Sequence, residues 1–234
     1  MLKAVLFDID GTITDTNYVF VETVIQTYAE FIGKVKPPEF FYFLFGMPSP
    51  ESLKILGIPE EKVLPFITRW QELIKKEMYR VKLFPGIVEV IEELFHRGLF
   101  MALVTSKIRS ELPYQFDCFG LNHYFQTVIC AEDTPKPKPS PDPLLRACQK
   151  LRVSPSNTVF IGDSRYDIIA AKEAHLPFLF ASWGTLDPAP VRILHPEYDL
   201  EKPLDILTVV KSLLPQKETG KDLCAHKILL PQGM

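Results

Sequence analysis

The sequence has few cysteines, and their spacing excludes the usual cysteine-based sites. Four occur in 234 residues, and no two of them form a C-x-x-C pair. His123 and His226 each follow a cysteine, but no second cysteine stands beside either of them to complete a zinc site. We therefore expect neither a disulfide scaffold nor a structural zinc ion. This pattern fits a reducing compartment, so we expect the protein to be cytoplasmic.

Long runs of basic or apolar residues are also lacking. The formal net charge is −3, and the densest basic group, between Lys75 and Lys82, is interleaved with other side chains as on a solvated helix face. We therefore expect no nucleic-acid partner. No apolar run is long enough to span a membrane, and the short run before Asp8 is interrupted too soon for a signal peptide. The 47% of hydrophobic residues suffices for one sizeable core, or for a core with a smaller appendage.

What the sequence does contain is an alternation of short apolar runs and amphipathic segments. The apolar runs are expected to be strands buried on both faces: 4–9, 100–105, 127–130, 159–162 and 178–181. The amphipathic segments have helical spacing: 87–96, 143–151, 164–174 and 204–214. Strand followed by helix, repeated, predicts the α/β class, with a doubly wound parallel sheet and right-handed crossovers.

One region departs from this alternation. Between Thr16 and Leu83 two helical patterns, 18–32 and 60–79, flank a stretch rich in proline and aromatic residues, and no strand is evident. Pro65 is expected to delay the start of the second helix. The region therefore predicts a helical domain inserted into the core. The predicted division is a core over residues 1–15 and 84–215, a helical insert over 16–83, and an unassigned tail over 216–234.

Two carboxylates, Asp8 and Asp10, stand at the end of the first expected strand. Alternation along a strand projects both to one side, where a cation would relieve their repulsion. Hard oxygen ligands with open coordination positions suit Mg²⁺, and Gly11 permits a tight turn. A simple Asp-Gly turn explains Gly11 but not Asp8, whose burial within a strand costs free energy. We therefore interpret this cluster as functional.

Two further clusters have plain structural alternatives. Thr105 and Ser106 end the second expected strand, where a hydroxyl and backbone N–H groups suit a phosphate oxygen. A helix N-cap explains the same pair, and taken alone it is the better explanation. Lys136 and Lys138 lie in a proline-rich loop. One of these lysines would serve as a compact cation that neutralises phosphate, or both are simply solvated side chains of a surface loop.

The fourth cluster, Gly162 to Asp167, repeats the pattern of the first. Asp163 follows an apolar run, and Asp167 lies one helical turn later. Helix capping accounts for only one of these acids, so the pair favours metal binding. We expect the first strand to be central, with the second and third strands to one side and the fourth and fifth to the other. All four clusters then meet in one crevice at the carboxyl ends of the strands.

These motifs, in this order, resemble those of the haloacid dehalogenase-like hydrolase superfamily. The matches are DIDGT at 8–12, Thr105-Ser106, KPSPDP from Lys138, and GDSRYD at 162–167. The nearest patterns are those of phosphoglycolate phosphatases, a pyrophosphatase of similar build and β-phosphoglucomutase, which carry a small helical cap. The resemblance implies a Rossmann-like core with the helical insert as the cap. It also implies an Mg²⁺-dependent phosphatase that acts on a small phosphorylated metabolite, such as phosphoglycolate or pyrophosphate, through an aspartyl-phosphate.

The resemblance also assigns roles to individual residues. Asp8 is expected to be the nucleophile and a metal ligand, and Asp10 the general acid and then base, with a metal-binding backbone carbonyl. Lys138 is expected to stabilise the phosphoryl group, and we prefer it to Lys136 because KPSPDPLL fits the family pattern better. The other expected phosphate-binding residues are Gly11, Thr12, Thr105 and Ser106. The other expected metal-binding residues are Asp163 and, as ligand or support, Asp167.

The insert is expected to govern substrate choice by closing over the crevice. Its loop 43–49, with Gly46, Met47 and Pro48, is our candidate contact for the leaving group. The neighbouring aromatic residues 40–43 have a simpler explanation as packing.

Other activities of the superfamily are alternatives to this one. A dehalogenase typically lacks the second acid, and a phosphonate hydrolase has Ala there with a cap lysine. Asp10 argues against both, although Lys34 and Lys36 stand in the insert. A phosphomutase shares all four motifs and stays an alternative. A non-catalytic binding protein is another, but it would predict the loss of Asp8, Asp10 or Lys138. No feature predicts a partner other than the small substrate, or a particular oligomeric state.

Overall fold

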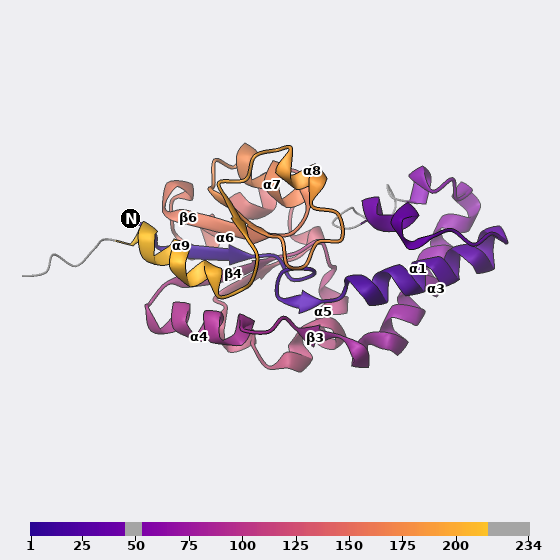
Figure 1. Ribbon diagram of the computed structural model, residues 1–234, viewed down its shortest axis with the longest axis horizontal. Helices are drawn as coiled ribbons and strands as arrows, with labels where there is room; N and C mark the ends of the chain where they lie inside the picture. Colours follow the sequence, from indigo (N-terminus) through magenta and orange to yellow (C-terminus); the bar gives the residue numbers. More distant parts are fainter. Residues whose placement is uncertain (45–52, 215–234) are drawn as a thin grey trace, which may run out of the picture.

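The centre of the protein is a parallel sheet with helices on both faces (Figure 1). The computed structural model describes residues 1–44 and 53–214. Its six main strands lie in the order β5-β4-β1-β6-β7-β8, and every neighbouring pair is parallel. Their bounds are β1 Ala4–Phe7, β4 Phe100–Val104, β5 Thr127–Ile129, β6 Thr158–Gly162, β7 Phe178–Ala181 and β8 Tyr198–Leu200. The predicted α/β class and doubly wound sheet are confirmed, and β8 adds an edge strand that was not predicted.

The strands are buried on both faces because their side chains alternate between two cores. In β1, Val5 and Phe7 join one hydrophobic cluster, while Ala4 and Leu6 join the other. The helices α4 and α9 cover the first cluster, and α6 and α7 cover the second. Their bounds are α4 Ile87–His96, α9 Asp205–Leu213, α6 Asp142–Leu151 and α7 Arg165–Glu173. This double covering explains why the strands are near-continuous apolar runs.

The helical insert, residues 16–83, has a hydrophobic core of its own. Within it, α1 and α3 lie side by side beyond the end of the sheet to which β1 points (Figure 1). Val24, Tyr28, Phe41 and Phe66 are buried together in this core. The elements of the insert are α1 Asn17–Ile32, η1 Pro38–Leu44 and α3 Glu60–Glu77. The separate core supports our proposal that residues 16–83 form a domain inserted between 1–15 and 84–215.

Two features of the insert differ from the expectations. A two-residue antiparallel ladder, β2 (Thr14–Asp15) with β3 (Lys82–Leu83), joins the segments where the chain enters and leaves it. Segments this short carry no periodic signal. The prediction for Pro65 was wrong, because α3 begins at Glu60 and contains Pro65. Proline removes one main-chain hydrogen bond, but α3 continues through it, and the next residue, Phe66, is fully buried in the core of the insert.

The connections hold short helical segments. These are η2 Met78–Arg80, η3 Arg109–Glu111, α5 Leu112–Gln115, η4 Asp117–Phe119, η5 Asn122–Tyr124, η6 Ala131–Asp133, η7 Pro155–Asn157 and α8 Ala189–Arg192. Among the described residues, no helix has both the length and the apolar character needed to cross a membrane. The predicted tail, and Gly46, Met47 and Pro48 of the predicted leaving-group loop, lie outside the described residues.

Candidate active site

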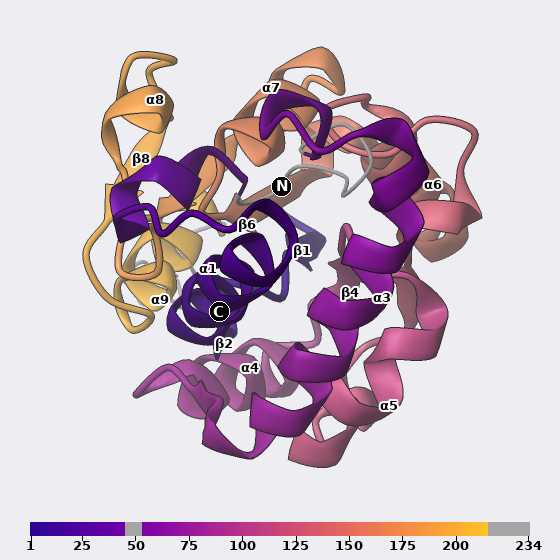
Figure 2. The same cartoon turned by 90° about the vertical axis from the view of Figure 1, so that its right-hand side faces the viewer.

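The candidate site lies at the carboxyl ends of β1, β4 and β6, where the helical insert faces the sheet. Figure 2 looks onto this edge, with α1 and α3 in front of the strands. Asp8 directly follows β1, Thr105 follows β4, and Asp163 follows β6. Parallel strands end at the same edge, so residues far apart in the chain become neighbours here.

Lys138 joins three of these segments. Its Nζ donates hydrogen bonds to Asp8 Oδ1 at 2.8 Å, to Asp167 Oδ1 at 2.6 Å and to the carbonyl oxygen of Val104 at 3.1 Å. The side chain is 3% exposed. Burial alone would lower the pKa of Lys138, but the charges and hydrogen bonds of Asp167 and Asp8 outweigh it and raise that pKa. Lys136, the rival candidate, is exposed, so the geometry supports the preference for Lys138.

Three buried carboxylates surround this ammonium group. One oxygen from each of Asp8, Asp163 and Asp167 lies within 4.8 Å of the other two. Burial raises the pKa of Asp8 to about 7, with Asp167 and Asp10 adding to the effect and Lys138 opposing it. Burial and the charges of Asp167 and Asp8 likewise raise the pKa of Asp163. One ammonium facing three carboxylates leaves two negative charges when all are ionised, and a divalent cation would balance them.

Asp163 and Asp167 differ in how the chain engages them. Asp167 Oδ2 accepts hydrogen bonds from Ser164 N at 3.0 Å and Ser164 Oγ at 2.5 Å, and its Oδ1 accepts from Lys138. Ser164 and Asp167 thereby form the capping box that begins α7. Within the part of the chain that the structure describes, no hydrogen bond reaches the Asp163 carboxylate. Of the two, Asp163 therefore has the carboxylate without a hydrogen-bond donor among the described residues, whereas both oxygens of Asp167 are engaged.

Gly11 is required by the position of Asp163. Its φ of +68° lies in the left-handed region, and a Cβ atom there would stand 2.1 Å from Asp163 Oδ2. Gly184 packs against the same turn, since a Cβ on it would lie 1.7 Å from the carbonyl oxygen of Gly11. Trp183 Nε1 donates to the carbonyl oxygen of Thr12 at 3.1 Å. The turn after β1 is thus clamped between two other loops.

Asp10 is positioned by this turn and not by strand alternation, which corrects the sequence argument. The strand ends at Phe7, and beyond it the N–H groups of Ile13 and Thr14 bond back to the carbonyl oxygen of Ile9, which closes a turn around Asp10. Asp10 Oδ1 accepts from Thr16 Oγ1 at 2.7 Å. Its Oδ2 forms an ion pair with Lys107 Nζ, also at 2.7 Å.

Lys107 is a site residue that the sequence analysis missed. Its side chain is 4% exposed, and its Nζ also donates to Gln115 and lies 5.0 Å from the ring centre of Phe20. The signal was its place directly after Thr105 and Ser106, at a strand end already singled out. A single lysine near a helix start normally suggests a solvated side chain, so it did not attract notice.

The predicted phosphate-binding hydroxyls have different surroundings. Thr105 Oγ1 accepts from the N–H of Lys107 at 3.1 Å, which gives it a local turn-forming role. Ser106 Oγ and Thr12 Oγ1 are buried and have no hydrogen-bond partner among the described residues. A buried polar group left unpaired costs about 1–3 kcal/mol. Such hydroxyls are suited to an incoming oxygen ligand.

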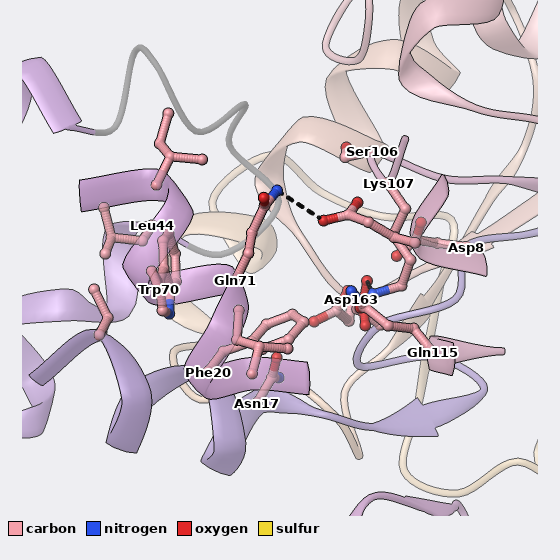
Figure 3. Close-up of a pocket in the computed structure, with 15 residues that line it drawn as sticks. Asp8, Asn17, Phe20, Leu44, Trp70, Gln71, Ser106, Lys107, Gln115 and Asp163 are labelled. Carbon is pink, nitrogen blue, oxygen red and sulfur yellow. Dashed lines mark hydrogen bonds and ion pairs between the residues drawn. The ribbon is translucent and has the colours of Figure 1, made fainter. Parts of the chain in front are cut away.

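A cavity of about 130 Å³ connects these groups with the helical insert (Figure 3). Asp8, Asp10, Ser106, Lys107 and Asp163 line one end, and apolar side chains of α1 and α3 line the other. Pockets for drug-sized ligands are roughly 300–1,000 Å³, so this space suits a small metabolite. A second cavity of about 440 Å³ lies between η1 and α8 and shares Asp163 with the first. Phe43, from the predicted leaving-group loop, lines this second cavity.

Comparisons with known proteins agree on one family. Residues 5–181 match the family model of the haloacid dehalogenase-like hydrolases. Pyrophosphatase PpaX from Oceanobacillus iheyensis is 30% identical, and the match covers 89% of this chain and 97% of that protein. Pyrophosphatase PpaX from Bacillus velezensis is 29% identical, and the match covers 89% of this chain and 96% of that protein. The solved structure of a "putative phosphoglycolate phosphatase" from Lactobacillus plantarum is 32% identical, with a TM-score of 0.82 over 89% of this chain and 99% of that one.

Proposed function

The chain belongs to the haloacid dehalogenase-like hydrolases and is a phosphatase of that family, and we propose that it works through a covalent aspartyl-phosphate on Asp8. The observation that carries this proposal is the contact of Lys138 with both Asp8 and Asp167, beside Asp163. A carboxylate attacks an anionic phosphate only where charge is neutralised. The buried Asp8 next to a fixed cation meets that requirement.

We propose Mg²⁺ as the cofactor. The donor set consists of hard carboxylate oxygens, and the buried Asp163 carboxylate has no hydrogen-bond donor among the described residues. Asp8 and Asp163 would hold the ion together with the backbone carbonyl of Asp10, while Asp167 would fix Lys138. When bound, the ion supplies positive charge that neutralises the phosphoryl oxygens and the carboxylates around them.

In the first step, a carboxylate oxygen of Asp8 attacks phosphorus and the bond from phosphorus to the ester oxygen breaks. Asp10, in its protonated form, gives its proton to the leaving oxygen, so that a neutral alcohol departs. Lys138 stays protonated throughout, and its positive charge balances the negative charge of the phosphoryl group. The unpaired Ser106 hydroxyl is placed to donate to a phosphoryl oxygen.

In the second step, water attacks phosphorus and the bond to the Asp8 oxygen breaks, which releases orthophosphate and restores the Asp8 carboxylate. Asp10, now ionised, takes the proton from the water. Lys107 and Thr16 hold this ionised carboxylate in place. The two partners of Asp10 therefore serve the hydrolytic half of the cycle.

We further propose that the protein acts in the cytoplasm on a small phosphorylated substrate. The described cysteines, Cys118, Cys130 and Cys148, are all free thiols, which supports a reducing compartment.

The test is phosphate release from 4-nitrophenyl phosphate with Mg²⁺ and with a chelator in its place. We expect the wild type to turn over only with the metal. We expect no turnover from Asp8→Asn, and circular dichroism should show that this variant keeps the wild-type fold. Isomerisation of a sugar phosphate without release of phosphate would indicate a mutase instead.

A further inference from the structure

The first cavity changes character along its length. The end that holds Asp8, Asp10 and Asp163 is polar, whereas the end formed by the helical insert is largely apolar, with Asn17 and Gln71 as its polar side chains. Leu44 and Trp70 lie on the insert's side of the pocket, away from the acids (Figure 3). Phe20, also from the insert, lies closer to them, with its ring centre 5.0 Å from the Lys107 ammonium that pairs with Asp10. Val24, Ile67 and Ile74 complete that apolar wall.

The cavity holds almost no positive charge for a second anionic group. Among the described residues that line it, Lys107 is the only cation, and its ammonium is already bound by Asp10 and Gln115. Glu111, which lines the same space, adds a carboxyl group that accepts from Gln71 at 3.3 Å. An anion placed against this wall would be buried without a cation to pair with it, which is costly.

The leaving group belongs in this cavity and not in the second one. Asp10, which protonates the leaving oxygen in the proposed reaction, lines only the first cavity, and so does the nucleophile Asp8. The second cavity is lined by the exposed Arg165, but among the carboxylates of the candidate site only Asp163 lines it.

We propose that the preferred substrate is the phosphomonoester of an uncharged, largely apolar alcohol, such as an aryl or short alkyl phosphate. This rests on the proposed phosphatase function and specifies its substrate class. The apolar wall favours burial of a hydrocarbon leaving group, and it disfavours the second phosphate of pyrophosphate or the carboxylate of phosphoglycolate. The substrate class therefore differs from the one that the name of the PpaX relatives states.

The test compares substrates that differ in charge at one end. Phenyl phosphate and 4-carboxyphenyl phosphate place the same ring in the cavity, and inorganic pyrophosphate and phosphoglycolate extend the series. We expect kcat/KM for phenyl phosphate to exceed that for each charged substrate by at least about tenfold. A higher kcat/KM for pyrophosphate, phosphoglycolate or the carboxylated ring would overturn the proposal.

Two variants locate the effect in the apolar wall. Ile67→Lys puts a cation into it and is expected to reduce the preference for phenyl over 4-carboxyphenyl phosphate by about tenfold or more. Leu64→Lys adds the same charge to α3 at a position that is 72% exposed and outside the cavity, so the preference should stay as in the wild type. Equal preferences in both variants and the wild type would contradict the assignment.

The outcomes separate this proposal from the function on which it rests. Hydrolysis of the charged substrates in preference to phenyl phosphate would refute the proposed substrate class, while the proposed phosphatase function would stand. If that preference disappears in Arg165→Ala, the leaving group occupies the second cavity. Failure to release phosphate from any of the four substrates with Mg²⁺ would refute the proposed function itself.

Discussion

Lys107 Nζ lies 2.7 Å from Asp10 Oδ2, so the residue that we propose as the acid for the leaving group is held by a buried cation from the loop after β4. Thr16, at the start of the helical insert, binds the other oxygen of the same carboxylate. The proposed acid and base is therefore oriented by the core and the insert together.

Replacing Lys107 by Met should slow the second chemical step more than substrate binding. We expect kcat to fall by about tenfold to a hundredfold, as part of the roughly 10²–10⁴-fold that general acid–base catalysis contributes, with KM little changed. Rapid-quench measurement should show that phosphorylated enzyme accumulates. Lys107→Arg should recover part of kcat. A rise in KM alone would show that Lys107 binds substrate instead.

The metal-free protein should lose stability as the pH rises. Burial raises the pKa of Asp8 from its ordinary 3.8 to about 7, so the folded state holds this proton more tightly than the unfolded state. The resulting stabilisation is complete below pH 3.8 and is lost as the pH passes through about 7. Asp8→Asn removes this dependence, and at about pH 8 without metal it should be more stable than the wild type by at least about 1 kcal/mol, since one pKa unit is worth about 1.4 kcal/mol. Denaturant unfolding across this range measures both proteins, and an Asn variant less stable than the wild type at high pH would refute the argument.

Gly11→Ala should disable the site through contact with Asp163 as well as through backbone strain. Gly33 provides the control, because its φ of +71° is similar but a Cβ on it would meet nothing within 4 Å. We expect each substitution to destabilise the fold by about 1–2 kcal/mol through the left-handed backbone. Only Gly11→Ala should also abolish most activity and the stabilisation of the fold by Mg²⁺. Equal effects of the two substitutions on activity would contradict this reading of the turn.

Asp163 and Asp167 should respond differently to the same Asp→Asn change. Asp163→Asn removes a proposed metal ligand, so the increase in Tm on adding Mg²⁺ should disappear. Asp167→Asn removes a partner of Lys138 and should reduce kcat while retaining most of that increase. The increase reports binding directly, since a ligand of the folded state stabilises by RT ln(1 + [L]/Kd). If only Asp167→Asn loses the increase in Tm with Mg²⁺, then Asp167 is the metal ligand and Asp163 is not.

The sequence predicted the parts of the fold that repeat. Apolar runs and helical spacing located five of the six main strands and the four large core helices, because burial on both faces of a sheet leaves a strong compositional signal. The edge strand β8 was missed because it is three residues long and Asp199 at its centre is exposed. The strand end at Phe7 and the helix through Pro65 were set by local hydrogen bonds and by packing that no periodicity reveals.

The candidate site was predictable where an acidic residue directly follows a buried strand. Asp8 and Asp163 are conspicuous because a carboxylate follows directly on apolar residues. Lys107 was not conspicuous, since its role comes from contact with Asp10 across the crevice. The apolar wall formed by residues such as Trp70 looks in the sequence like the packing face of an amphipathic helix. Only the placement of the helical insert over the sheet turns that face into part of a cavity.

The most direct test of the account is to look for phosphate on Asp8. Wild-type enzyme is mixed with phenyl phosphate and Mg²⁺, quenched in acid within one turnover, and digested for peptide mass spectrometry. We predict one phosphoryl group on the peptide that contains Asp8, and none in Asp8→Asn. Turnover in the wild type with no phosphoryl group on that peptide, together with turnover in Asp8→Asn, would contradict the covalent mechanism.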